Sequence, residues 1–150
     1  MLLKAIEIAV KSHSGQLDKA GELYILHPMR MMMKMDTEEE KITAVLHDVV
    51  EDSEVTINDL RKEGFSENIL NAVDAMTKRD GESYKKSIER VKKNPLAVKV
   101  KVADFEDNMD ISRLKRITEK DRKRLNRYLK YYREVKLLLP YAGYEAPVRS

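Results

Sequence analysis

Apolar residues recur at helical spacing along most of the chain, and polar capping residues divide this pattern into separate helices. The first apolar stripe consists of Leu2, Ile6, Ala9 and His13. Gly15 is expected to end this helix, because glycine is the preferred residue just past a helix terminus. A polar loop over residues 16–22 follows, with Gly21 as its turn residue.

A methionine-rich segment follows the dipeptide His27-Pro28. Proline favours the first helical position and pushes the preceding residue into an extended conformation, so we expect His27 at a fixed junction between loop and helix. Methionine fills irregular gaps in cores, and we expect the residues of this segment to do so. They are Met29, Met31, Met32, Met33 and Met35.

Capping residues predict four further helices downstream, each starting at a serine or threonine. The first begins with a capping box at Thr37-Glu38-Glu39-Glu40, and the second starts at Thr56 and stops at Gly64. The third runs from Ser66 to about Thr77. The fourth runs from Ser83 to Lys93 and is ended by Asn94-Pro95.

The segment from Leu96 to Ile111 fits two interpretations. Val98, Val100 and Val102 alternate with lysines, which is typical of a strand over a short window. A lone strand would have no partner elsewhere in the chain, and Pro95 marks a helix start, so we favour a helix. A last long helix is expected over 119–139, followed by a tail over 140–150. The prediction is an all-α fold, a compact single-domain helical bundle.

Composition agrees with one helix-rich domain spanning residues 1–150. The chain has 150 residues, 37% of them charged, with five glycines and four prolines, and a single core typically serves about 100–200 residues. Cysteine is absent, which excludes disulfides, thiolate metal sites and thiol nucleophiles. No apolar run could span a bilayer and no signal-peptide pattern is present, so we expect a cytoplasmic protein without a membrane partner.

Basic residues are concentrated between Arg113 and Lys136, although the net charge is only +3. Such a face could meet nucleic acid or an anionic ligand. Acidic residues interrupt the basic ones and no aromatic platform accompanies them, so a solvated helix face is the preferred interpretation. Nucleic acid is therefore not the expected partner, and the sequence gives no indication of oligomeric state.

The segment from residue 44 to 52 carries the most informative chemistry. Taken as one helix, it places His47, Asp48 and Glu51 on one stripe, with Asp52 at its edge, beside a separate apolar stripe. Three neighbouring carboxylates repel one another, and a bound divalent cation removes that repulsion. Imidazole and carboxylate donors without thiolate favour Mn, Fe, Zn or Mg.

Two other positions complete a candidate metal site. His27 is anchored beside a proline, and Asp104 ends an apolar run in which a carboxylate needs a partner. Together with His47 and Asp48 they would form a site of two histidines and two aspartates with room for water.

These segments resemble the HD-domain hydrolases of the RelA/SpoT type, including the small single-domain hydrolases of the alarmone guanosine tetraphosphate. The resemblance covers about residues 5–135. The matching segments, in chain order, are His13-Ser14-Gly15-Gln16 with Lys19 and Gly21, Tyr24-Ile25-Leu26-His27-Pro28, Leu46-His47-Asp48-Val49-Val50-Glu51-Asp52, Thr77 to Tyr84, and Lys101-Val102-Ala103-Asp104 with Asn108.

The resemblance implies a role for each matching residue. The metal ligands would be His27, His47, Asp48 and Asp104, usually for Mn²⁺, although other divalent metals are possible. Glu51 and Asp52 would activate the attacking water and handle proton transfer. Lys19 would face the phosphates and Asn108 would contact the substrate. The reaction implied is hydrolysis of a 3′-diphosphate ester with release of pyrophosphate.

Two further residues are expected to bind substrate from their positions in the chain. Tyr84 and its neighbouring lysines could meet a phosphate, and Arg113 follows the predicted Asp104 helix closely enough to reach the mouth of a pocket. His13 is expected to be a structural hydrogen-bonding residue.

Two departures from the family pattern keep other functions open. Asp18 stands where the bifunctional alarmone enzymes have an arginine that packs on guanine, and the segment over 106–110 is acidic. An acidic rim would disfavour a polyphosphate. One alternative is therefore a phosphohydrolase acting on another nucleotide or phosphoester, such as NADPH. Another is a non-catalytic nucleotide-binding module.

Overall fold

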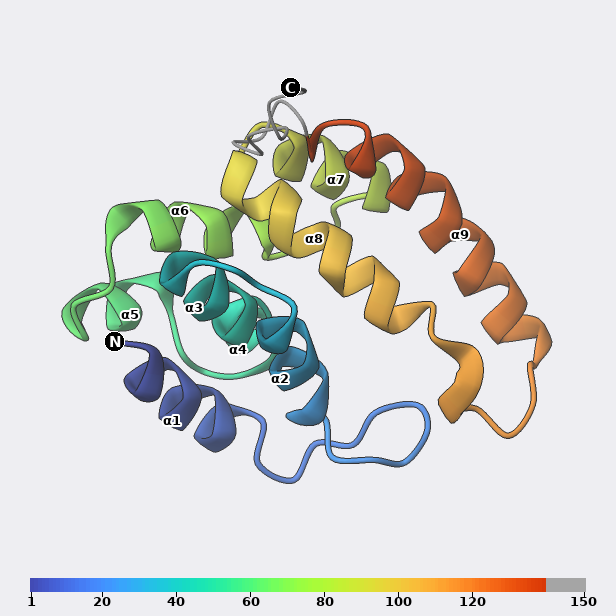
Figure 1. Ribbon diagram of the computed structural model, residues 1–150, viewed down its shortest axis with the longest axis horizontal. Coiled ribbons are helices and arrows are strands. Elements are labelled where there is room, and N and C mark those ends of the chain that lie inside the picture. Colours follow the sequence, from blue (N-terminus) through green and yellow to red (C-terminus); the bar gives the residue numbers. More distant parts are fainter. Residues whose placement is uncertain (140–150) are drawn as a thin grey trace, which may run out of the picture.

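The structure is a computed structural model that describes residues 1–139, so the predicted tail over 140–150 lies outside the described residues. Every regular element within 1–139 is helical, and the one extended pairing there is an isolated bridge between Leu17 and Leu23. The helices (Figure 1) are α1 (Leu2–Ser12), α2 (Leu26–Met33), α3 (Glu38–Leu46), α4 (Val49–Asp52), α5 (Ile57–Lys62), α6 (Glu67–Met76), α7 (Tyr84–Lys92), α8 (Pro95–Asn108), the 3₁₀ turn η1 (Ile111–Arg113) and α9 (Glu119–Lys136). The prediction of a compact all-α fold is confirmed.

Side-chain caps set the helix starts where the sequence placed them. Thr37 accepts a hydrogen bond from the Glu40 amide, and Glu40 accepts one from the Thr37 amide, which is a complete capping box. Capping boxes also open α5 and α9, while Ser66 and Ser83 cap α6 and α7. Each cap satisfies amides that the helix itself cannot pair, so these boundaries follow from local chemistry.

Helix α8 crosses the middle of the molecule (Figure 1) and resolves the ambiguity over residues 96–111. The Asn94 side chain accepts from the Ala97 amide, and Pro95 occupies the first turn. Val98, Val100 and Val102 are all buried, although they do not share one helical face. A helix packed on several sides buries apolar residues around its axis, which produces an alternation that resembles a strand.

The buried apolar residues form two clusters. The α8 cluster joins residues of α2, α3, α6, α7, α8 and α9, with Phe105 and Met31 among its largest members. The α1 cluster joins residues of α1, α3, α4, α5 and α6, with Leu46 and Leu70 among its largest members. The metal-ligand candidates therefore come from elements of both clusters.

Helix α2 differs from the sequence expectation in two respects. It begins at Leu26, so His27 lies inside the first helical turn rather than in an extended junction. Pro28 is tolerated there because the first amides of a helix lack intrahelical partners. Met31 and Met35 are buried as expected, but Met33 is 79% exposed because it lies on the solvent side of this short helix.

The helix expected through residues 44–52 is interrupted. Helix α3 ends at Leu46 and α4 starts at Val49, with His47 and Asp48 in the turn between them. The prediction that one continuous helix carries His47, Asp48 and Glu51 on a single face is therefore wrong. The turn directs His47 into the interior, where it is 2% exposed, and starts a new helical turn that carries the acidic pair.

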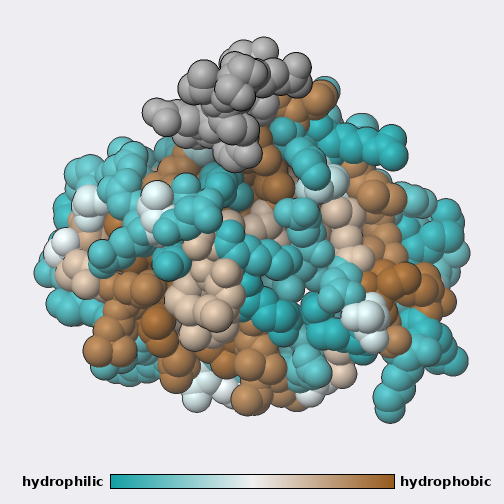
Figure 2. All heavy atoms as spheres, in the orientation of Figure 1, coloured by the Kyte–Doolittle hydropathy of each residue, from teal (hydrophilic) through white to brown (hydrophobic). Residues whose placement is uncertain are grey.

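Hydrophilic and hydrophobic side chains are mixed on the face of the molecule that Figure 2 shows. Figure 2 shows hydrophilic side chains across much of one face, with hydrophobic groups distributed between them. On α9 only Tyr131 and Val135 are buried, and the exposed Arg122 pairs with Glu119 one turn earlier, which agrees with a solvated basic face. None of the helices described is both long and apolar enough to cross a membrane.

Candidate metal centre and adjoining cavity

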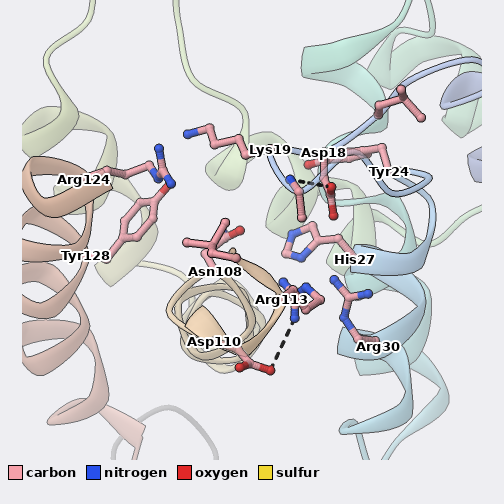
Figure 3. Close-up of a pocket in the computed structure, with 13 residues that line it drawn as sticks. Asp18, Lys19, Tyr24, His27, Arg30, Asn108, Asp110, Arg113, Arg124 and Tyr128 are labelled. Atoms are coloured by element: carbon pink, nitrogen blue, oxygen red, sulfur yellow. Dashed lines mark hydrogen bonds and ion pairs between the residues drawn. The ribbon is translucent and has the colours of Figure 1, made fainter. Parts of the chain in front are cut away.

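A cavity of about 370 Å³ opens between the first loop, α2, the end of α8, η1 and α9 (Figure 3). Its charged lining residues are four cations and two acids. The lining consists of Leu17, Asp18, Lys19, Ala20, Tyr24, His27, Arg30, Asn108, Asp110, Arg113, Leu114, Arg124 and Tyr128. This excess of cations suits an anionic ligand.

Three of the predicted substrate-binding residues line this cavity, and one does not. Lys19, Asn108 and Arg113 are all at its wall. Tyr84 is not among the lining residues; its ring packs against Tyr131 with 5.1 Å between centroids, beneath the Arg127 guanidinium. Its assignment to substrate binding thus stays a prediction.

Asp18, the aspartate that departs from the family pattern, has a structural role in the first loop. Asp18 Oδ1 accepts hydrogen bonds from the amides of Ala20 and Glu22, both at 2.9 Å. Gly21 has φ +82°, which a residue with a Cβ adopts only with strain. Asp18 therefore organises the turn that carries Lys19 to the cavity. Burial lowers the pKa of Lys19, and Arg124 across the cavity adds to this effect.

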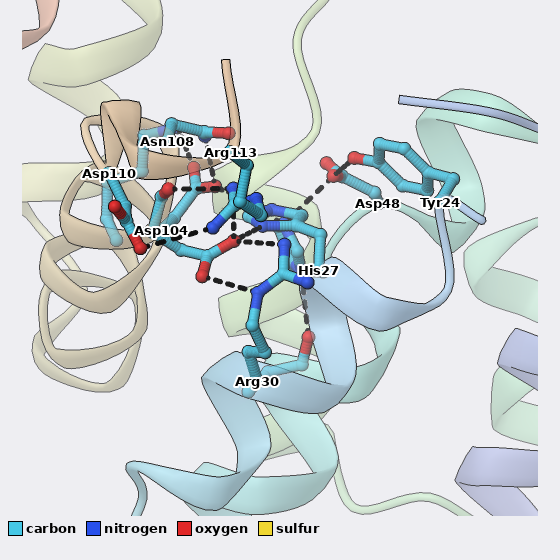
Figure 4. Close-up of polar contacts among 12 residues, drawn as sticks. Tyr24, His27, Arg30, Asp48, Asp104, Asn108, Asp110 and Arg113 are labelled. Carbon is cyan, nitrogen blue, oxygen red and sulfur yellow. Dashed lines mark hydrogen bonds and ion pairs between the residues drawn. The ribbon is translucent and has the colours of Figure 1, made fainter. Parts of the chain in front are cut away.

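His27 lies at the cavity wall and also belongs to a buried polar cluster (Figure 4). His27 Nε2 lies 3.0 Å from Asp104 Oδ1, and His47 Nε2 lies 3.7 Å from the same oxygen. Ligand atoms of these three residues all lie within 4.8 Å of one another. The structure thus brings together three of the four predicted ligands, although they come from α2, the α3–α4 turn and α8.

The outward-facing nitrogens of both histidines are already engaged. His47 Nδ1 donates to the Ala44 carbonyl at 2.7 Å, and His27 Nδ1 lies 2.6 Å from Asp107 Oδ2. A carbonyl can only accept, so the proton of neutral His47 is on Nδ1 and its Nε2 carries a lone pair. Buried His47 Nε2 makes no well-aligned hydrogen bond within the described residues, and it faces the carboxylates of Asp48 and Asp104. Metal-ligating histidines characteristically show this arrangement.

Electrostatics within the cluster favour a bound cation. Burial by itself lowers the pKa of His47, but Asp48 and Asp104 outweigh burial and raise it well above its ordinary value. The cluster therefore gathers positive charge, which a divalent cation can supply in place of protons. The donor set of imidazole and carboxylate fits such an ion.

Asp48, the fourth predicted ligand, lies at the edge of this group. Its Oδ2 is 2.9 Å from His47 Nε2 and also accepts a hydrogen bond from the Tyr24 hydroxyl. Burial opposes ionisation of Asp48, but His47 lowers its pKa to about 2, so the carboxylate is charged at neutral pH.

Asp104 is held by two further residues of α8. Lys101 Nζ donates to Asp104 Oδ2 at 2.7 Å, and Asn108 Nδ2 donates to Oδ1 at 2.9 Å. Burial opposes the charged form, yet Lys101 and the two histidines hold the pKa of Asp104 well below its usual range. Asn108 thus contacts a ligand candidate and lines the cavity at the same time.

The predicted acidic pair occupies α4, directly after the turn that bears His47 and Asp48. Glu51 Oε1 accepts from the Lys78 amide at 2.7 Å, which ties α4 to the segment after α6. Burial, followed by the charges of Asp48 and Glu51, raises the pKa of Asp52 to about 6. A carboxyl with a pKa near neutrality can both accept and return a proton.

His13 has the structural role expected of it. Its Nδ1 lies 2.8 Å from Gln16 Oε1, and Gln16 Nε2 donates to the Asp52 carbonyl at 2.9 Å. The first loop is thereby attached to the end of α4.

The acidic segment over 106–110 does not form the continuous rim that its sequence predicts. Glu106 is not among the cavity-lining residues and accepts a hydrogen bond from the Tyr132 hydroxyl at 3.3 Å. Asp107 is buried against His27 and Arg30, and only Asp110 lines the cavity. A helix separates consecutive residues by about 100°, which sends these acids in different directions.

Sequence reasoning missed four residues at this site: Arg30, Asp107, Arg124 and Tyr128. Asp107 had a usable signal, because it lies one helical turn after Asp104 in a segment with buried neighbours. The other three lie at partly buried positions of α2 and α9, and their convergence depends on how these helices pack.

The amino-acid sequence is similar to those of several curated bacterial enzymes. A guanosine-3′,5′-bis(diphosphate) 3′-pyrophosphohydrolase of Aquifex aeolicus is 32% identical over 118 residues, which cover 71% of this chain and 17% of that protein. A GTP pyrophosphokinase of Streptomyces coelicolor is 32% identical over 143 residues, which cover 86% of this chain and 16% of that protein. The chain thus spans about a sixth of the length of these curated relatives. No family model matches it.

A solved structure shares the fold. It belongs to a metazoan orthologue of SpoT described as hydrolysing ppGpp, and it aligns with a TM-score of 0.73 at 20% identity, covering 94% of this chain and 92% of that one. The sequence similarity to the bacterial enzymes, the shared helical fold and the cluster of His27, His47 and Asp104 all indicate the same family. The chain belongs with the HD-domain proteins of the RelA/SpoT type.

Proposed function

We infer that the protein is a Mn²⁺-dependent hydrolase that removes the 3′-diphosphate of guanosine 3′,5′-bis(diphosphate) as pyrophosphate. The observation that carries this proposal is the buried cluster of His27, His47 and Asp104, which opens through His27 into a cavity with an excess of cations. The names of the bacterial relatives support the same substrate.

The metal would be held by His27, His47 and Asp104, with Asp48 at its edge, and when bound it would polarise the phosphoryl group and acidify water. Lys101 and Asn108 keep Asp104 oriented. The hydrogen bonds from Nδ1 of each histidine keep its Nε2 directed at the cluster.

Glu51 and Asp52 would handle the proton balance. Water adds its oxygen to the phosphorus, the bond between that phosphorus and the 3′ oxygen breaks, and one proton passes from the water to the departing nucleoside oxygen. Asp52, with its pKa raised to about 6, is suited to accept and return that proton. Lys19 and Arg124 would bind the phosphates of the far diphosphate, since both line the cavity away from the cluster.

The test is pyrophosphate release from guanosine 3′,5′-bis(diphosphate) by metal-stripped protein, with and without added Mn²⁺. We expect Mn²⁺-dependent turnover, and Asp52→Asn should lower the rate roughly 10²–10⁴-fold while Mn²⁺ binding persists. Full activity of Asp52→Asn with metal bound would remove its assigned role. No turnover by metal-loaded wild type, with turnover of another nucleotide in a substrate panel, would replace the proposed substrate.

A further inference from the structure

Asp107 is a buried carboxylate that bonds to a candidate metal ligand and to a cavity arginine at the same time. It is 3% exposed, and its Oδ2 accepts from His27 Nδ1 at 2.6 Å. The same carboxylate accepts two hydrogen bonds from Arg30, from Nε to Oδ1 at 2.8 Å and from Nη2 to Oδ2 at 3.0 Å. This paired geometry fixes the plane of the guanidinium as well as its position.

Arg113 approaches the same aspartate from η1. Its Nη2 donates to the Asp107 carbonyl at 3.2 Å and lies 3.7 Å from the carboxylate. Its Nη1 has only a long contact, 3.4 Å, with the largely exposed Asp110. Both Arg30 and Arg113 line the cavity, and in Figures 3 and 4 they lie beside each other on the side of His27.

Both guanidiniums retain unused donors. Asp107 is the sole hydrogen-bond partner of Arg30 among the residues described, which leaves the Nη1 amino group of Arg30 unpaired. Nε of Arg113 is buried and has no partner within 1–139. An unsatisfied buried donor such as Arg113 Nε costs free energy. The Arg30 side chain is 31% exposed and lines the cavity, where an anion with several acceptor oxygens can accept from its free Nη1.

We propose that Asp107 is a positioning residue that couples the metal centre to an anion subsite formed by Arg30 and Arg113, which binds the diphosphate group beside the metal. This inference rests on the proposed function for the identity of the anion. The coupling follows from the shared carboxylate: whatever displaces it moves His27 and both arginines together. Lys19 and Arg124, which do not touch Asp107, form a separate set of cations on the other side of Asn108 (Figure 3).

The subsite can be measured without turnover, by calorimetric titration with inorganic pyrophosphate. Mn²⁺ is kept in fixed excess, so that every variant meets the same metal–pyrophosphate species. We expect Arg30→Gln and Arg113→Gln each to weaken pyrophosphate binding roughly 10- to 100-fold, the value of a charge-assisted hydrogen bond, without lowering Mn²⁺ affinity. The matched control is Arg61→Gln, which breaks a similar paired contact between the exposed side chains of Arg61 on α5 and Glu67 on α6. It should change neither the pyrophosphate affinity nor the Mn²⁺ affinity.

Asp107→Asn separates positioning from packing, because it keeps the size of the side chain and removes the charge. It should weaken pyrophosphate and Mn²⁺ binding together, each by about 10- to 100-fold, while its melting curve remains a single cooperative transition. A merely structural role would lower the melting temperature and leave both affinities of the folded protein at wild-type values, which would overturn the proposal.

Two outcomes distinguish this inference from the proposed function. If wild type hydrolyses guanosine 3′,5′-bis(diphosphate) and Arg30→Gln binds pyrophosphate as tightly as wild type, the subsite is wrong and the function stands. If wild type binds pyrophosphate through Arg30 but hydrolyses only another phosphoester, the subsite stands and the substrate changes.

Discussion

Replacing Lys101 by methionine tests whether the buried cluster is balanced electrostatically as the structure indicates. Lys101 Nζ lies 2.7 Å from Asp104 Oδ2, and the two side chains are 16% and 8% exposed. At an effective dielectric constant of about 20, a pair at this distance attracts by about 6 kcal/mol, an upper limit before desolvation is subtracted. Breaking one side of a buried pair typically costs about 3–5 kcal/mol.

Lys101→Met keeps the aliphatic stem but leaves the Asp104 charge without its lysine. We expect the metal-free protein to lose about 3–5 kcal/mol of unfolding free energy. At about 2–4 °C per kcal/mol for a chain of this size, the melting temperature should fall by roughly 6–20 °C. Because a bound cation would neutralise Asp104 instead, added Mn²⁺ should raise the melting temperature of the variant more than that of wild type.

The matched control is Lys99→Met, on the same helix. Lys99 pairs with Asp36 at 3.1 Å, but Asp36 is 78% exposed, and such pairs contribute about 0–1 kcal/mol. Differential scanning fluorimetry of both variants, with EDTA and with Mn²⁺, makes the comparison. Equal small losses in the two variants, or equal stabilisation of Lys101→Met and wild type by Mn²⁺, would refute this account of the cluster.

Three further predictions concern the metal, the pH dependence of stability and the core. His47→Gln should abolish saturable Mn²⁺ binding in calorimetry, because it removes Nε2, the ring nitrogen that faces Asp48 and Asp104; retained affinity would exclude His47 as a ligand. Arg90 lowers the pKa of Glu82 to about 2, so the stabilisation from Glu82 is complete above its unfolded pKa near 4.5 and disappears as pH falls toward 2. In urea titrations, the deficit of Glu82→Gln should therefore be full at pH 7 and vanish near pH 2, and a deficit that persists at pH 2 would contradict the pairing. Phe105→Ala should cost about 3–5 kcal/mol in urea unfolding, because Phe105 is 1% exposed in the α8 cluster, and a loss below 1 kcal/mol would mean that this core repacks.

Local chemistry made most of the helices predictable. Thr37, Thr56 and Ser83 each cap a helix with their own side chains, so the information for these boundaries lies within four residues. The same locality explains the loop at Gly21. Pairing partners far apart in the chain were harder to predict, and the errors at the candidate site lie there.

The break between α3 and α4 shows why part of the site could not be predicted. Nothing in the sequence around His47 and Asp48 is a helix breaker, and the turn exists because both residues have partners elsewhere in the chain. Asp107 was misjudged for a similar reason. Its burial depends on His27, 80 positions earlier, so an acid that belongs to the interior looked in isolation like part of an acidic surface.

The division of the interior into the α8 cluster and the α1 cluster has a consequence for motions of the folded protein. Separately packed regions tend to open as separate cooperative units, which amide hydrogen exchange can resolve. His47 follows α3, which contributes Val45 and Leu46 to the α1 cluster and Ala44 to the α8 cluster, whereas Asp104 lies on α8 between members of the α8 cluster. An ion bound to His47 and Asp104 would couple the two clusters. The slowly exchanging amides of α8 and α3 would then exchange through the same opening of the structure. The metal ion would then cross-link the α8 cluster and the α1 cluster.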